Sequence, residues 1–215
     1  MSTPVPYREI AILGPGLLGA SLALALKDRA CVRLWGRRPE SIAEAEERGI
    51  APCCTTMLSE AVSGADLVIF ATPVEVMGGI ARDLLPFLSP GAAVTDVGSV
   101  KGPVVAELQP IFGAHRFLGS HPMAGSEQSG SSAARADLFT GAACILTPTK
   151  QTPPSLLEDI TALWQSLNCE VHLLTPELHD RRIALISHLP HLLAACLVNT
   201  VADADPAAFP LSGQG

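Results

Sequence analysis

The sequence has few aromatic and few charged side chains. Phe, Trp and Tyr make up 4% of its 215 residues, and Asp, Glu, Lys and Arg make up 16%. Scarce aromatic residues disfavour the stacking platforms that bind single-stranded nucleic acids. The net charge of −7, with no run of basic residues, disfavours contact with a phosphate backbone. We therefore expect no nucleic-acid partner.

Signals for disulfides, export and metals are also missing. The six cysteines include no Cys-x-x-Cys pair and no disulfide-framework spacing. The first residues lack a basic region followed by an apolar one, so no export signal is visible, and we expect a reducing, cytoplasmic location. Pro190 separates His188 from His191, and neither cysteines nor a His-Glu-x-x-His pattern supports them or His179 as zinc ligands. We expect no metal site.

One apolar stretch, from Ile183 to Ala202, is about as long as a membrane span. It contains Ser187, His188 and Pro190, which are costly in lipid. We therefore expect no membrane contact, and we interpret the stretch as a helix buried in a protein core or in a subunit interface.

Short apolar runs alternate with helix-length segments over most of the chain. Such alternation predicts an α/β fold with a mostly parallel sheet covered on both faces. From residue 176 onward the pattern is helical with no further strand. We expect one domain over residues 1–173 and the start of a helical domain over residues 174–215. The expected strands are 9–13, 31–35, 67–71, 92–97, 117–119, 144–147 and 170–173, and the expected helices of the first domain are 17–27, 39–48, 74–85, 100–109 and 154–167.

The turn after the first expected strand reads GPGLLG and matches the pattern G-x-G-x-x-G in the strand–turn–helix context that dinucleotide binding requires. Gly14 allows a tight turn, Gly16 lets a pyrophosphate approach the backbone, and Gly19 lets helix and strand pack closely. The pyrophosphate would meet the positive end of the helix dipole. The alternative is a purely structural turn. The predicted cofactor-binding residues of this turn are Gly14, Gly16, Leu17, Leu18 and Gly19.

The second expected strand is followed by Gly36, Arg37 and Arg38. Enzymes that use NAD usually have an acidic residue here, which binds the ribose 2′-hydroxyl. A glycine followed by two guanidinium groups favours a clamp on the 2′-phosphate of NADP, with NAD as the other possible cofactor. The alternative is that both arginines begin a solvated helix.

Three further turns, ATPVE, DVGSVKG and HPMAG, fall at expected strand ends, where ligands of parallel sheets bind. We expect Thr72 and Pro73 to contact the cofactor. Ser99 either N-caps the following helix or holds its hydroxyl near cofactor and substrate, and the two interpretations are compatible. His121 follows a strand, and its neutral imidazole could accept a hydroxyl proton while hydride leaves the same carbon. An alcohol dehydrogenase without a metal needs such a base.

Together, GPGLLG, ATPVEV, DVGSVKG, GSHPMAGSE and HDRRIALISHLPH resemble the prephenate/arogenate dehydrogenase family of tyrosine biosynthesis, from about Ile10 to the end of the chain. The resemblance implies a Rossmann-type domain followed by a helical dimerisation domain, and therefore a homodimer. It also implies oxidative decarboxylation of prephenate or arogenate, with hydride transfer to NAD(P)⁺.

The resemblance also implies roles for four side chains. His121 would bind the substrate's 4-hydroxyl and accept its proton, and Ser99 would orient His121 and the nicotinamide. Glu127 would lie near the substrate mouth and His188 near the substrate pocket. Members of the family normally continue past a segment like residues 212–215 into one with an arginine that binds a substrate carboxylate, so we expect incomplete substrate binding here. A non-catalytic dinucleotide-binding module and another NADP-linked hydroxyacid dehydrogenase remain as alternatives.

Overall fold

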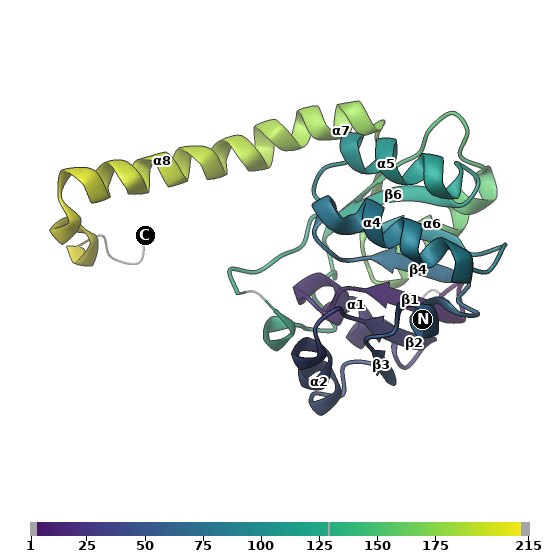
Figure 1. Ribbon diagram of the computed structural model, residues 1–215. Helices are drawn as coiled ribbons and strands as arrows, with labels where there is room; N and C mark the ends of the chain where they lie inside the picture. Colours follow the sequence, from purple (N-terminus) through teal and green to yellow (C-terminus); the bar gives the residue numbers. More distant parts are fainter. Residues whose placement is uncertain (1–3, 129, 212–215) are drawn as a thin grey trace.

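A computed structural model describes residues 4–128 and 130–211 of the chain, without the side chains of His188 and Leu211. Helices and strands alternate as the sequence predicts (Figure 1). The strands are β1 (Glu9–Leu13), β2 (Cys31–Trp35), β3 (Cys53–Thr55), β4 (Leu67–Phe70), β5 (Ala93–Asp96), β6 (Phe117–Pro122), β7 (Ala143–Thr147) and β8 (Glu170–Leu173). The α-helices are α1 (Leu17–Leu26), α2 (Pro39–Glu47), α3 (Leu58–Val62), α4 (Val74–Leu84), α5 (Gly102–Phe112), α6 (Pro154–Ser166), α7 (Pro176–Ile183) and α8 (Leu189–Ala204).

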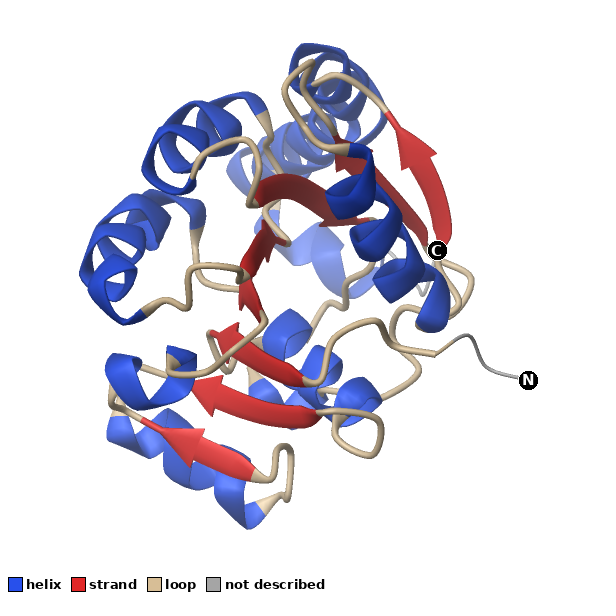
Figure 2. Ribbon diagram, turned by 90° about the vertical axis from the view of Figure 1, so that its right-hand side faces the viewer, coloured by secondary structure: helices blue, strands red, loops and turns tan. Residues whose placement is uncertain are grey.

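The described strands form one sheet in the order β3-β2-β1-β4-β5-β6-β7-β8. Neighbouring strands are parallel, except that β6 and β7 are antiparallel. Helices cover both faces of the sheet (Figure 2). The chain order reverses direction between β1 and β4, which is where sheets of this kind bind ligands. The predicted α/β class with a mostly parallel sheet is confirmed.

The core has two layers because alternate strand residues point to opposite faces. On β1, Ile10 and Ile12 pack in the cluster that contains α1 and α6, whereas Ala11 and Leu13 pack in the cluster that contains α3, α4 and α5. The strand β4 is buried along its whole length, as its sequence LVIF requires. Each fully buried apolar side chain of this size stabilises the folded state by roughly 1.5–3 kcal/mol. The sheet therefore holds its carboxyl edge rigidly.

The structure differs from the predicted elements in four places. The short strand β3 and helix α3 were not expected. The helix expected from residue 100 begins at Gly102. The strand β6 continues to Pro122, so His121 lies inside it and pairs with Ile145, rather than in a turn after the strand. The antiparallel strand β7 supplies the partners that extend β6.

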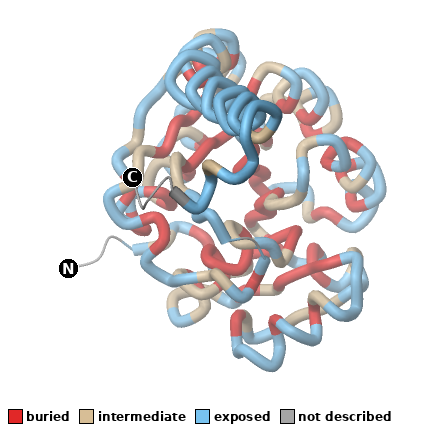
Figure 3. Tube along the Cα trace, turned by 90° about the vertical axis from the view of Figure 1, so that its left-hand side faces the viewer, coloured by how far each residue is buried: buried red, intermediate tan, exposed pale blue. Residues whose placement is uncertain are grey.

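After β8 the chain forms one long helical rod, composed of α7, the π-helical turn Ala184–His188 and α8 (Figure 1). The rod points away from the sheet, and its outer part is exposed on all sides (Figure 3). The leucines of α8 are exposed, Leu197 by 67%, so this stretch is not buried in a core of the chain, and its burial in a subunit interface stays a prediction. By length and composition alone, helix Pro176–Ala204 could cross a membrane, because an 18-residue stretch within it has a mean hydropathy of 1.5.

Candidate active site

The carboxyl ends of β1, β4, β5 and β6 meet at one edge of the sheet because these strands run parallel. This edge carries Gly14 after β1, Thr72 after β4 and Gly98 after β5, with His121 near the end of β6. The sheet thus brings together the four segments that the sequence placed at strand ends.

The glycine-rich turn is packed tightly on one side and open on the other. Gly14 has φ 118°, and a Cβ there would lie 2.5 Å from the carbonyl oxygen of Ala71. A Cβ on Gly19 would lie 1.9 Å from the carbonyl oxygen of Gly14. At Gly16, by contrast, no described atom outside the adjoining backbone lies within 4 Å of the Cβ position. Gly14 and Gly19 therefore permit close packing, whereas Gly16 leaves the surface in front of the turn accessible.

Beside the turn lies a cavity of about 440 Å³. Helix α1 points its N-terminus here, and its N-cap residue is Gly16, which has no side chain to cap the first N–H groups. The hydroxyl oxygen of Thr72 is buried and has no hydrogen-bond partner within the described chain. A helix N-terminus and an unsatisfied hydroxyl are suitable partners for a pyrophosphate. The cavity is lined by Gly14, Pro15, Gly16, Trp35, Gly36, Arg37, Arg38, Ser41, Glu44, Ala71, Thr72, Pro73, Val76, Ile80, Gly130 and Ser131.

We expect Gly16→Ala to leave folding unchanged and to weaken dinucleotide binding by about tenfold or more. The methyl group meets no described protein atom. It would occupy the space through which a pyrophosphate approaches the backbone, and a tenfold loss corresponds to about 1.4 kcal/mol. Thermal unfolding and calorimetric titration with NAD⁺ and NADP⁺ measure the two effects. Gly91→Ala, at another open position, is the matched control, and unweakened binding by Gly16→Ala would contradict the assignment.

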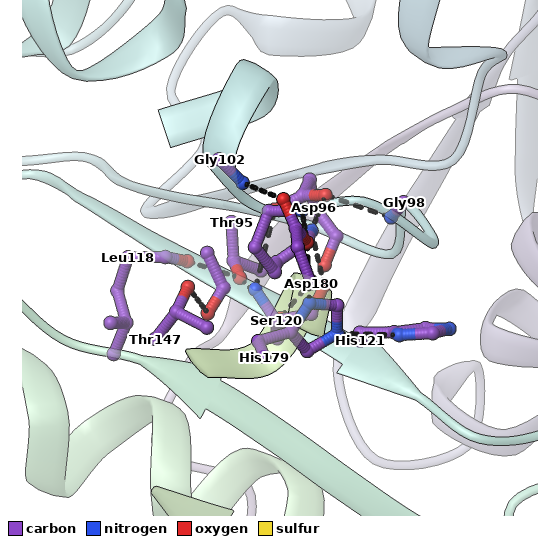
Figure 4. Close-up of polar contacts among 12 residues, drawn as sticks. Thr95, Asp96, Gly98, Gly102, Leu118, Ser120, His121, Thr147, His179 and Asp180 are labelled. Atoms are coloured by element: carbon purple, nitrogen blue, oxygen red, sulfur yellow. Dashed lines mark hydrogen bonds and ion pairs between the residues drawn. The ribbon is translucent and has the colours of Figure 1, made fainter. Parts of the chain in front are cut away.

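His121 begins a chain of polar contacts that crosses from β6 to α7 (Figure 4). Its Nδ1 lies 2.9 Å from Nε2 of His179, and Nδ1 of His179 lies 2.7 Å from Oδ1 of Asp180. The Asp180 carboxylate accepts the backbone N–H groups of Lys101 at 2.7 Å and Gly102 at 2.8 Å, at the start of α5. His179 is fully buried, and burial lowers its pKa. The imidazole of His121 is thus held through two side chains of α7.

A buried ion pair lies next to this chain of contacts. Lys101 and Asp96 are both fully buried and form an ion pair. Lys101 also donates from Nζ to the carbonyl oxygen of Ser120 at 2.8 Å, and Asp96 accepts the backbone N–H of Gly98 at 2.7 Å. Burial raises the pKa of Asp96 and lowers that of Lys101, so each group needs the other to stay charged. The pair fixes the loop between β5 and α5 against β6.

Three predicted substrate residues have different surroundings. Ser99 is exposed on the loop between Asp96 and Lys101. It does not cap α5, whose N-cap is Lys101, so the capping interpretation is wrong. Glu127 is exposed in the loop after β6. The side chain of His188 lies outside the described residues.

Two residues of this cluster, His179 and Asp180, were missed. In the sequence, His179 was considered only as a zinc ligand, and Asp180 was not singled out. In the described part of the chain, no group of three or more His, Cys, Asp or Glu side chains could hold a metal ion.

The sheet order, the glycine-rich turn and the adjoining cavity define the class as a Rossmann-type, dinucleotide-binding protein. The family follows from sequence comparison. Residues 22–173 match the model of the prephenate dehydrogenase nucleotide-binding domain, and residues 175–214 match that of the prephenate dehydrogenase dimerization domain. The chain belongs to the prephenate dehydrogenase family, as its motifs indicated.

Individual relatives agree with this family. The chain is 35% identical to cyclohexadienyl dehydrogenase of Zymomonas mobilis, over 91% of the chain and 68% of the relative. It is 36% identical to prephenate dehydrogenase of Bacillus subtilis, over 88% of the chain and 53% of the relative. The chain thus spans between about half and about two thirds of these proteins.

Solved structures give the same result. Prephenate dehydrogenase from Aquifex aeolicus, in complex with hydroxyphenyl propionate and NAD⁺, has a TM-score of 0.88 and 35% identity, over 96% of this chain and 75% of that one. Synechocystis arogenate dehydrogenase has a TM-score of 0.82 and 33% identity, with the same two coverages.

Proposed function

We propose that this chain carries the catalytic base and the cofactor site of an NAD(P)-dependent prephenate or arogenate dehydrogenase. The position of His121 is the observation that carries the proposal. It is a buried imidazole on β6, at the same sheet edge as the glycine-rich turn, and two further side chains hold it. The activities named for the relatives support the same reaction.

In this proposal, His121 accepts the proton of the substrate's 4-hydroxyl while the carbon that carries it loses a hydride. A nicotinamide cofactor held at the cavity beside the glycine-rich turn would accept this hydride. The resulting ketone draws electrons from the ring, the bond to the ring carboxylate breaks, and carbon dioxide leaves. The electron pair of that bond completes the aromatic ring. The proton then returns from His121 to the phenolic oxygen, so the imidazole ends the cycle neutral.

We assign substrate contacts to Ser99, Glu127 and His188 in addition to His121. The exposed Ser99 follows β5 at the carboxyl edge of the sheet, and Glu127 comes six residues after His121, which supports these two assignments. The cofactor contacts are Gly14, Gly16, Leu17, Leu18, Gly19, Arg37, Arg38, Thr72, Pro73 and Ser99. We also propose a boundary at residue 173/174 between the dinucleotide-binding and helical parts.

Product formation tests the function directly. The chain is incubated with prephenate or with arogenate, each with NAD⁺ and with NADP⁺, and the reduced nicotinamide and carbon dioxide are measured. We expect equal amounts of both with at least one substrate. Saturable cofactor binding without turnover of either substrate would instead identify a non-catalytic dinucleotide-binding module.

We propose that NADP is preferred over NAD. Arg37 and Arg38 are exposed and line the cavity, where they can reach a 2′-phosphate. Gly36 is buried, and a Cβ there would lie 2.9 Å from the ring of Pro15 and 3.0 Å from Ile42. Because there is little room for a larger residue, an acidic side chain that binds the 2′-hydroxyl does not fit here unless its neighbours move.

We expect Arg37→Ala to lose most of a preference for NADP of roughly ten- to a hundredfold. One charge-assisted contact contributes about 1.5–3 kcal/mol, and solvent exposure and salt reduce this value. Glu44 lines the same cavity, and its negative charge repels a 2′-phosphate, which reduces the preference for NADP further. Dissociation constants for both cofactors, at low and moderate salt, measure the effect. Arg8→Ala is the control, and equal affinities in the parent would refute the clamp.

We further propose that the helical rod pairs with a second copy of the chain. The exposed leucines of α8 and the match to a dimerization domain support this proposal. A cytoplasmic location is also a proposal, supported by the absence of disulfides among the cysteines, which are all free thiols.

A further inference from the structure

We propose that His179 and Asp180 are positioning residues that hold His121 in the tautomer with hydrogen on Nδ1, so that Nε2 is the atom that accepts the substrate's proton. The last step rests on the proposed function, whereas the tautomer is a property of the chain alone. The contacts between these side chains run from Asp180 through His179 to His121 (Figure 4).

Asp180 fixes the direction of the chain of hydrogen bonds. Burial acts to raise the pKa of its carboxyl, but the N–H groups of Lys101, His179 and Gly102 outweigh burial and hold this pKa below its usual value. An ionised carboxylate can only accept hydrogen bonds. Nδ1 of His179, 2.7 Å from Oδ1, must therefore carry a hydrogen and donate it.

His179 passes this direction on to His121. Because burial lowers the pKa of His179, its imidazole is neutral near pH 7. A neutral imidazole with hydrogen on Nδ1 has a lone pair on Nε2, which can only accept. The contact of 2.9 Å between this atom and Nδ1 of His121 then requires hydrogen on Nδ1 of His121. The proton-accepting lone pair of His121 lies on Nε2.

The other ionisable groups around the two imidazoles leave this assignment in place. Asp96 and Lys101 come from β5 and the following loop, and Cys144 comes from β7. Lys101 gives its Nζ hydrogens to Asp96 and to the carbonyl oxygen of Ser120, so it does not compete for His179. Burial raises the pKa of Cys144 well above its usual value, so its thiol is uncharged.

The arrangement makes the base depend on the helical part of the chain. His121 lies in the segment that matches the nucleotide-binding domain, whereas His179 and Asp180 lie in the segment that matches the dimerization domain. Asp180 also accepts hydrogen bonds from the backbone N–H groups of Lys101 and Gly102 at the start of α5. The N-cap residue of α5, Lys101, does not cap this helix with its side chain. Docking of α7 on α5 therefore orients the base.

Nitrogen NMR of histidine-labelled protein tests the tautomer without any turnover. Long-range ¹H–¹⁵N spectra of the 215-residue chain distinguish hydrogen on Nδ1 from hydrogen on Nε2. We expect His121 to carry hydrogen on Nδ1 in the parent. Asp180→Asn removes the negative charge and places an amide donor beside either Nδ1 of His179 or the N–H group of Gly102, so it should weaken the preference of His121 for hydrogen on Nδ1.

A matched pair at position 179 gives an independent test. His179→Gln can place an amide oxygen near the site of Nε2 and should keep the tautomer of His121, whereas His179→Leu removes the acceptor and should abolish the preference. His172→Gln changes a half-exposed histidine on β8 and is the control. The pair also covers the case in which Asp180→Asn fails to fold.

The activity assay adds a measurement of kcat, which would not change if His179 and Asp180 had a merely structural role. We expect Asp180→Asn and His179→Leu to lower kcat on the order of 10²-fold or more, with little change in cofactor affinity. His179→Gln should stay within about tenfold of the parent. A parent His121 with hydrogen on Nε2, or variants that change neither tautomer nor kcat, would overturn the inference. If no turnover is found, the proposed activity fails while the tautomer spectra still decide the inference.

Discussion

Replacing Lys101 by methionine is expected to destabilise the folded chain by about 3–5 kcal/mol. Lys101 and Asp96 are fully buried and paired, so the substitution leaves a carboxylate without its cation in the core. Its remaining partners are the backbone N–H groups of Gly98 at 2.7 Å and Ser120 at 3.3 Å. Urea unfolding gives the change in the free energy of unfolding.

A double variant separates the lost charge from lost packing. Lys101→Met combined with Asp96→Asn removes both buried charges and should recover most of the lost stability, since a buried pair is worth little more than neutral groups of similar volume. Lys150→Met, at an exposed position, is the control and should change stability by less than about 0.5 kcal/mol. A single variant as stable as the parent would show that the pair does not hold the loop.

The sequence predicts the sheet well because its strands are buried apolar runs. LVIF and EIAIL are typical of central strands, and the turns after them carry recognisable glycine and proline signals. The strand β3, with the sequence CCT, is too short to show a period and was missed. The end of β6 was also missed, because the polar residues Ser120 and His121 resemble a loop until β7 is known to pair with them.

Only those parts of the candidate site that are formed by residues adjacent in the sequence could be predicted. The glycine-rich turn and His121 are read from neighbouring residues, whereas the contact of His121 with His179 joins positions 58 residues apart. No period or motif shows that Asp180 would cap a helix that begins 78 residues earlier.

The small residues around His121 also have a reason that the sequence hides. In the sequence, they suggest space for cofactor and substrate rings beside the imidazole. At Gly119, however, a Cβ would lie 2.7 Å from the hydroxyl oxygen of Thr147 on β7. Strand packing therefore requires this glycine, whereas a Cβ at Gly125 would meet no described atom within 4 Å.

His121→Asn is expected to lower kcat on the order of 10²–10⁴-fold, which is the usual contribution of a general base. The substitution is selective. The side-chain amide of asparagine can still donate to Nε2 of His179, as Nδ1 of His121 is expected to do, but it has no basic nitrogen in place of Nε2. Initial rates at saturating substrate and cofactor, measured for the parent and the variant, give the change in kcat.

Dinucleotide affinity should change little in His121→Asn, because β5 separates β6 from β4, where the cavity beside the glycine-rich turn begins. His115→Asn makes the same replacement at an exposed histidine after α5 and should leave both kcat and cofactor affinity at the parent values. Near-parental turnover by His121→Asn would remove His121 from the role of base. A combined loss of turnover and cofactor binding would indicate instead that the substitution disturbs the sheet edge as a whole. The base assignment therefore requires kcat to fall while the dissociation constant of the cofactor stays the same.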